Sequence, residues 1–144
     1  MFLITPLVNI APSVSVLDQS HRLCNDAIAS AAVACDGEFS ERLSFLISQM
    51  HDAFTTEERW MEGMDHGALQ CHREQHARAL GAMHHIHASV MQGNIGVGRR
   101  AVTELLPKWL AFHTETMDNV LALALRCDER RETHREPQPA PELA

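Results

Sequence analysis

The sequence has no tyrosine, and it has only 7 glycines and 6 prolines in 144 residues. A fold made of many short strands needs frequent turn residues, so this scarcity disfavours an all-β protein. No C-x-x-C pair occurs among the cysteines, which excludes a zinc knuckle and a thioredoxin-type redox site. The four cysteines are Cys24, Cys35, Cys71 and Cys127.

Basic residues are also scarce. The chain has 12 lysines and arginines against 19 aspartates and glutamates, giving a formal net charge of −7. This balance disfavours nucleic acid or an anionic membrane as a partner. The apolar start lacks the positive region of a signal peptide, and Pro6, Asn9 and Pro12 interrupt it, so we expect neither a signal peptide nor a transmembrane helix. We interpret residues 1–15 as an N-terminal arm packed along the domain of a reduced, cytoplasmic protein.

The rest of the chain reads as one helical domain. Hydrophobic residues make up 45% of the sequence, enough for one buried core. Apolar residues recur at steps of three and four, which predicts an all-α, antiparallel up-down four-helix bundle over residues 1–130, with a disordered polar tail over 131–144. Asp65 is the expected N-cap of the third helix, and Pro107 is expected to kink or restart the fourth. The four helices are expected over residues 16–34, 40–63, 65–91 and 99–130.

One pair of histidines has the spacing of a metal site. His72 and His76 lie four residues apart, so they share one face of the third predicted helix. The spacing is weak on its own, because with 10 histidines in the chain such a pair can arise by chance. An exposed pair on a solvated face is the alternative interpretation.

The other three predicted helices each offer a further ligand of the same kind. His21 lies on the first, Glu57 on the second, and His113 and Asp118 on the fourth. Ionisable groups are costly inside an apolar bundle unless they bind a metal or one another. Imidazoles with bridging carboxylates suit iron, and bundle cores are known hosts of di-iron sites.

These motifs together resemble the hemerythrin family, in particular the bacterial hemerythrins, over residues 16–124. The resemblance implies a four-helix bundle with two non-haem iron ions that bind O₂ reversibly. It also implies that one iron is held by three histidines, that His21 holds the other, and that Glu57 and Asp118 bridge them. The three histidines are His72, His76 and His113. The motifs that carry the resemblance are D-x-x-H at 18–21, TEERWM at 56–61, H-x-x-x-H at 72–76 and H-x-x-x-x-D at 113–118.

One position departs from the family pattern. Where the family has H-F-x-x-E-E on the second helix, this chain has A-F-T-T-E-E, beginning at Ala53. The missing histidine would belong to the second iron, on which O₂ binds in the family. His51 is a poor substitute because it lies two residues earlier, about 200° around the helix.

Several interpretations therefore stay open. The chain is expected to bind O₂ or a related diatomic such as NO, for sensing, delivery or storage; its sequence indicates no oligomeric state. Alternatives are an oxidase- or peroxidase-type enzyme that uses the position opened by Ala53, and a degenerate structural or interaction domain. Cys24, one turn after His21, is expected to be an inert core thiol, with a replacement ligand as the alternative. A stretch of three further histidines is expected to be solvated, with a second metal contact or a haem contact as the alternative; these are His84, His85 and His87.

Overall fold

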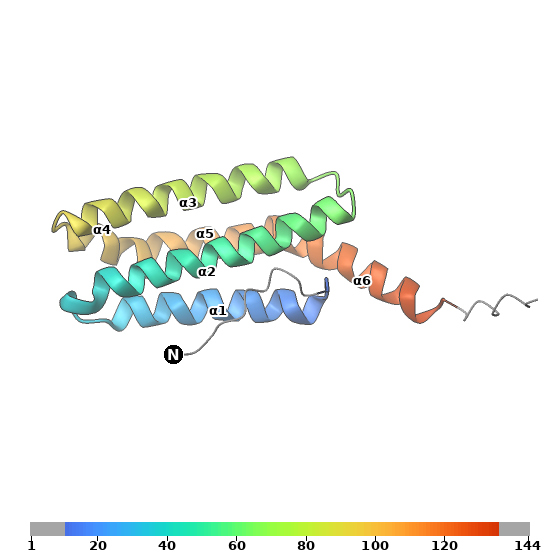
Figure 1. The fold of residues 1–144 in the computed structure, drawn as a ribbon, viewed down its shortest axis with the longest axis horizontal. Helices are drawn as coiled ribbons and strands as arrows, with labels where there is room; N and C mark the ends of the chain where they lie inside the picture. The colour runs from blue at the N-terminus through green and yellow to red at the C-terminus, as the bar shows by residue number, and fades with distance from the viewer. Residues whose placement is uncertain (1–10, 136–144) are drawn as a thin grey trace, which may run out of the picture.

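The chain folds into a four-helix bundle, described here for residues 11–135 of a computed structural model. The fourth helix is continuous along the chain, and two π-helical turns, η2 (Ala101–Leu105) and η3 (Thr114–Asp118), interrupt its α-helical winding. Each of the four helices of the bundle runs in the opposite direction to the one before it along the chain (Figure 1). No strand occurs in the described part, so the predicted all-α bundle is confirmed. The elements are α1 (Val14–Val33), α2 (Asp36–Gly63), α3 (Leu69–Met91), α4 (Ile95–Arg100), η2 (Ala101–Leu105), α5 (Leu106–His113), η3 (Thr114–Asp118) and α6 (Asn119–Thr133).

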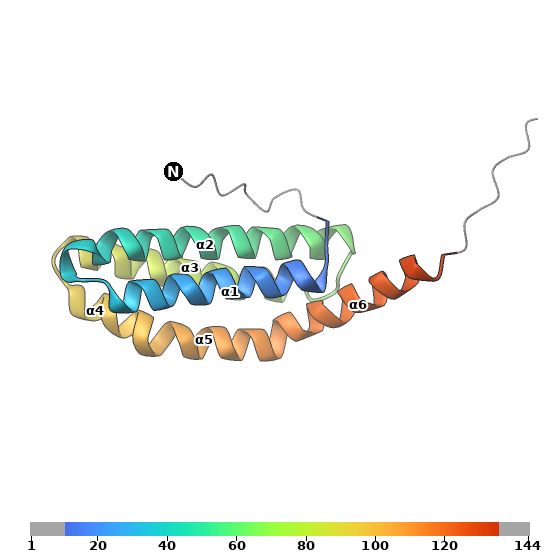
Figure 2. The same cartoon turned by 90° about the horizontal axis from the view of Figure 1, so that it is seen from below.

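Both ends of the chain fall partly outside this description. Residues 1–10 of the predicted arm and residues 136–144 of the predicted tail lie outside the described residues. At the C-terminal end, α6 continues to Thr133, so the first part of the predicted tail is helical. Beyond the bundle, α6 projects past the ends of α2 and α3 (Figure 2). No helix within residues 11–135 combines the length and the apolar character needed to cross a membrane.

The prediction that Asp65 caps the third helix is wrong. Asp65 has a left-handed φ of 49° and follows the C-cap of α2, and α3 begins only at Leu69. The N–H of Asp65 donates to the carbonyl of Glu62, and the N–H of His66 donates to the carbonyl of Met61. These two bonds form a Schellman motif, so Asp65 ends α2 instead of starting α3.

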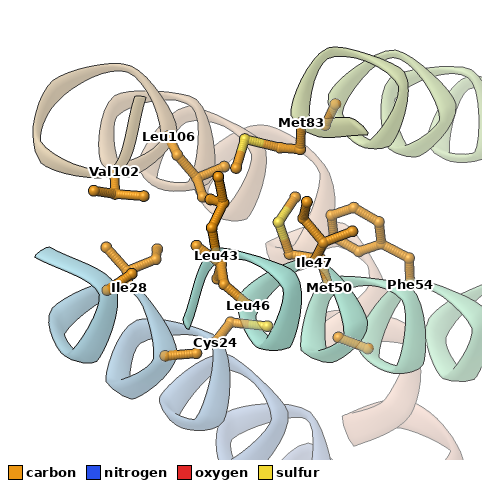
Figure 3. Close-up of a cluster of buried hydrophobic side chains, with 14 of the residues drawn as sticks. Cys24, Ile28, Leu43, Leu46, Ile47, Met50, Phe54, Met83, Val102 and Leu106 are labelled. Carbon is orange, nitrogen blue, oxygen red and sulfur yellow. The ribbon is translucent and has the colours of Figure 1, made fainter. Parts of the chain in front are cut away.

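Two apolar clusters fill the bundle. The larger cluster draws on all four helices and includes Met50, Phe54 and Met83 (Figure 3). The smaller cluster, between α1, α2 and α6, includes Leu17, Trp60 and Leu121. Burial of these side chains supplies the main stabilisation of a bundle.

The connection between α3 and α4 depends on glycine. The backbone at Gly93 has a φ of 100°, which closes α3 with a second Schellman motif. At Gly98, an added Cβ would come within 2.5 Å of Val90 and 2.6 Å of Phe39. Only glycine therefore lets α4 lie this close to α2 and α3.

Candidate metal centre

The polar residues of the bundle core begin with Glu57 on α2. Glu57 is 2% exposed, although its neighbours on the same face are apolar. Phe54 lies three residues before it in the larger cluster, and Trp60 and Met61 lie three and four residues after it in the smaller one. The helical repeat that buries these three apolar side chains therefore also carries the carboxylate into the core, between the two clusters.

The histidine pair on α3 faces the same place. His72 and His76 are 0% and 1% exposed, so the alternative of a solvated pair is wrong. Their rings meet edge to face with centroids 4.5 Å apart, as expected for residues one turn apart. Both Nε2 atoms lie 3.2 Å from Oε2 of Glu57. The three side chains thus converge from two neighbouring helices.

The fourth helix supplies His113 and Asp118 through a π-helical turn. In an α-helix, residues five apart point about 140° away from one another. Residues 114–118 form the π turn η3, in which the N–H of Asn119 donates to the carbonyl of Thr114. In such a turn, with its i→i+5 hydrogen bonds, residues five apart lie closer to one face than they do in an α-helix. Consequently both side chains are buried, and His113 Nε2 is 3.1 Å from Asp118 Oδ1.

Each carboxylate turns its two oxygens to different histidines. Asp118 Oδ1 lies 3.0 Å from His72 and 3.1 Å from His113, and Oδ2 lies 3.0 Å from His21. Similarly, Glu57 Oε2 faces His72 and His76, while Oε1 lies 3.5 Å from His21 Nε2. The two carboxylates therefore lie between a group of three imidazoles and the single imidazole of His21, which is about one quarter exposed.

Two residues that sequence reasoning did not identify orient the histidines. The Nδ1–H of His113 donates to Gln75 Oε1 at 2.8 Å, and the Nδ1–H of His76 donates to Glu58 Oε2 at 3.3 Å. With the proton held on Nδ1, Nε2 of a neutral ring is free to bind a metal. Glu58 lies within the TEERWM motif, but no pattern in the sequence marked Gln75.

Aromatic rings hold two of these imidazoles in place. Phe54 stacks on His76 with centroids 3.8 Å apart, and Trp109 stacks on His113 with centroids 4.6 Å apart. The rings also form part of the apolar wall, because Phe54 is buried and Trp109 packs against the larger cluster. Apart from His21, the side chains of the site are thus packed among apolar groups and screened from water.

The carboxylates and imidazoles shift each other's pKa. Burial alone would lower the pKa of His21, but Asp118 and Glu57 outweigh it and raise that pKa to about 10. The same two carboxylates raise the pKa of His72 to about 9 against the effect of burial. Conversely, burial alone would raise the pKa of Glu57 and of Asp118, but the surrounding imidazoles lower both well below their usual range.

A bound metal ion would satisfy the polar atoms of this site better than hydrogen bonds among its own side chains do. One ligand atom from each of five buried residues lies within 4.8 Å of all the others. His21 Nε2 and Asp118 Oδ1 are buried beside charged partners, yet neither is aligned for a hydrogen bond. A bound cation would satisfy these atoms, and imidazole with carboxylate suits a transition metal. The five residues are Glu57, His72, His76, His113 and Asp118.

The remaining candidates from the sequence lie beside this centre. Ala53 is 4% exposed and lies one turn before Glu57, in the larger cluster. His51 is exposed, so it does not enter the core in place of Ala53. Cys24 is buried, and both burial and the negative charges of Glu57 and Asp118 raise its thiol pKa to about 12. Its burial within the larger apolar cluster favours the interpretation of Cys24 as an inert core residue.

The fold and the site together define a four-helix-bundle protein with a buried histidine–carboxylate centre suited to metal. Residues 13–125 match the family model described as "Hemerythrin HHE cation binding domain". The chain is also 32% identical over 117 residues to a bacteriohemerythrin of Ralstonia nicotianae (strain ATCC BAA-1114 / GMI1000), covering 80% of this chain and 85% of that protein. This chain belongs to the hemerythrin family. No solved structure matches it significantly.

Proposed function

We propose that this protein binds two non-haem iron ions in the bundle core and, through them, O₂ or a related diatomic such as NO. Iron supplies the open coordination positions and the redox chemistry that such ligands require. The family match and the relative named as a bacteriohemerythrin support the choice of iron. The proposed ligands are His21, Glu57, His72, His76, His113 and Asp118.

The observation that carries the proposal is the division of the carboxylate oxygens. One oxygen of Glu57 and one of Asp118 face the three imidazoles of α3 and α5, and the other oxygens face His21. With a single metal ion beside the three imidazoles, the other oxygen of each carboxylate would pair with His21 and, for Asp118, also with the hydroxyl of Thr114. Two ions, one on either side, would use all four oxygens as bridges.

The surrounding residues would give the two positions different properties. On the side of His76 and His113, hydrogen bonds from Nδ1 and stacked aromatic rings fix both imidazoles, so iron should bind tightly there. On the other side, His21 is the one further ligand that residues 11–135 offer besides the bridging carboxylates, because the buried methyl group of Ala53 supplies none. Solvent or a diatomic ligand would complete that second position.

The same feature favours a second candidate function. Because Ala53 leaves an additional coordination position open, the second iron could activate O₂ instead of only holding it, as in oxidase- or peroxidase-type iron enzymes. Reversibility separates these two functions. A binding protein returns to its starting spectrum when O₂ is withdrawn, whereas an oxidase consumes O₂ together with a reducing substrate.

The test is iron analysis combined with optical spectra. Protein loaded with Fe(II) without air should contain two iron ions per chain, and O₂ should produce a visible absorption band that disappears under argon. Glu57→Gln keeps the side-chain volume but weakens the bridge, so it should lose the second iron and the band. Iron bound at one ion or fewer per chain, or a spectrum unaffected by O₂ and by NO, would contradict the proposal.

A further inference from the structure

A second pair of histidines meets on the outer surface of the bundle. His51 on α2 and His84 on α3 are both exposed, and their Nε2 atoms lie 2.9 Å apart. The ring centroids are 5.2 Å apart, with the planes tilted by 51°. His51 is two residues before Ala53, on the solvent side of α2, so the pair is separate from the centre in the core.

We propose that this pair is a surface site for a divalent late transition-metal ion. Imidazole nitrogen suits such ions, and the two Nε2 atoms are brought to one point by two helices that pack together over much of their length. The core centre contains the same arrangement, in which Nε2 of His76 and Nε2 of His113 are 3.1 Å apart. The surface pair repeats that geometry in contact with water.

The separation of the nitrogens indicates which kind of ion fits. Metal–imidazole bonds measure about 2.0–2.1 Å, so nitrogens at a right angle around the metal lie about 2.9 Å apart. Tetrahedral ligands at the same bond length lie about 3.3 Å apart. The observed 2.9 Å matches the right angle of square-planar, tetragonal or octahedral sites, which Ni²⁺ and Cu²⁺ adopt, better than the tetrahedron of Zn²⁺. Water would fill the remaining positions.

A hydrogen bond between the rings is a weak alternative explanation of the contact. One ring would have to donate its Nε2–H to the unprotonated Nε2 of the other, and water competes for both exposed groups. The net charge of −7 also favours a cation at the surface. The neighbouring His87 contacts another residue, because its Nε2 lies 3.3 Å from Ser40 Oγ.

An ion at this site would link α2 to α3. These helices carry Glu57, His72 and His76 of the core centre, so the surface ion would hold together the two helices on which that centre is built. Because the surface ion would bind the folded state and not the unfolded state, it would also raise the melting temperature by mass action.

The experiment titrates iron-loaded protein with Ni²⁺ by calorimetry and repeats the thermal melt with and without Ni²⁺. Wild type should bind one Ni²⁺ at this site and melt higher, and His51→Ala and His84→Ala should each weaken binding at least tenfold and abolish the rise. His85→Ala is the matched control, because His85 is exposed and next to His84 but outside the pair. The exposed cysteines are the same in every variant, so differences between variants report the histidines alone.

Three results would overturn the proposal. These are absence of Ni²⁺ binding to wild type, undiminished binding to His84→Ala, and equal loss in His85→Ala. Zn²⁺ bound more tightly than Ni²⁺ would contradict the right-angle assignment. Iron content and helical circular dichroism of each variant confirm that the bundle and its core centre are intact, so a failure here is distinguishable from a failure of the iron proposal.

Discussion

Replacing Ala53 with histidine should destabilise the packed core but add a ligand for the second metal ion. Ala53 is 4% exposed in a closely packed cluster, one turn before Glu57. Enlarging a packed core residue typically costs about 1–3 kcal/mol. For a domain of this size each kcal/mol lowers the melting temperature by about 2–4 °C. We therefore expect metal-free Ala53→His to melt roughly 2–12 °C below metal-free wild type.

In the iron-loaded protein the new imidazole should instead raise the stability, because it binds the metal. Loss of groups that merely orient a metal ligand weakens binding about 10–100-fold, so gain of a direct ligand should strengthen binding at least about tenfold. A tenfold change is about 1.4 kcal/mol, which offsets much of the packing cost. Ala53→His should therefore recover much of its lost stability when iron is added. By closing the extra open position, it should also prolong the O₂-dependent absorption.

The assay compares iron retained against a chelator in wild type, Ala53→His and Ala53→Leu. The leucine variant adds bulk without a nitrogen, so it should show the lower melting temperature of the metal-free protein and no gain in iron retention. If the histidine and leucine variants retain iron equally, the side chain at position 53 does not reach the second metal. The proposed ligand set would then be wrong on that side.

Three further predictions follow from the core and its packing. His76→Ala should remove the more tightly bound iron, and plasma emission spectrometry showing unchanged metal content would refute that ligand assignment. Gly98→Ala should lower the free energy of unfolding by about 1–3 kcal/mol through overpacking. Gly96→Ala is the control and should not lower it, because its added Cβ has nothing within 4 Å. Equal urea midpoints for the two variants would refute the close approach of α4. In the metal-free protein, the pKa values of His21 and His72 are raised to about 10 and about 9, so the folded state keeps protons that the unfolded state releases above pH 6.5. Stability should therefore fall as the pH rises from about 6.5 to about 10. His21→Gln should flatten this fall in urea titrations, and an unchanged slope would contradict the raised pKa.

The helical periodicity of the sequence determined the architecture. The apolar repeats predicted four helices, and the observed C-terminal ends at Val33, Gly63 and Met91 fall within about one residue of the expected ones. The second and fourth helices begin four residues earlier than expected, at Asp36 and Ile95. This worked because the period of 3.6 residues decides which side of a helix must be buried, whatever it packs against. The prediction failed at Asp65, since the choice between ending one helix and starting the next depends on backbone hydrogen bonds from both sides.

The sequence also determined which residues were candidate ligands, because ionisable side chains at core positions need a partner. It could not determine their arrangement. Asp118 lies five positions after His113, and the π turn η3 brings both into the core. Likewise, Gln75 meets His113 and His51 meets His84 because neighbouring helices pack in one particular register. The periodic pattern specifies the buried face of each helix, whereas distances between helices depend on their packing and on local changes in winding, which exist only in the folded chain.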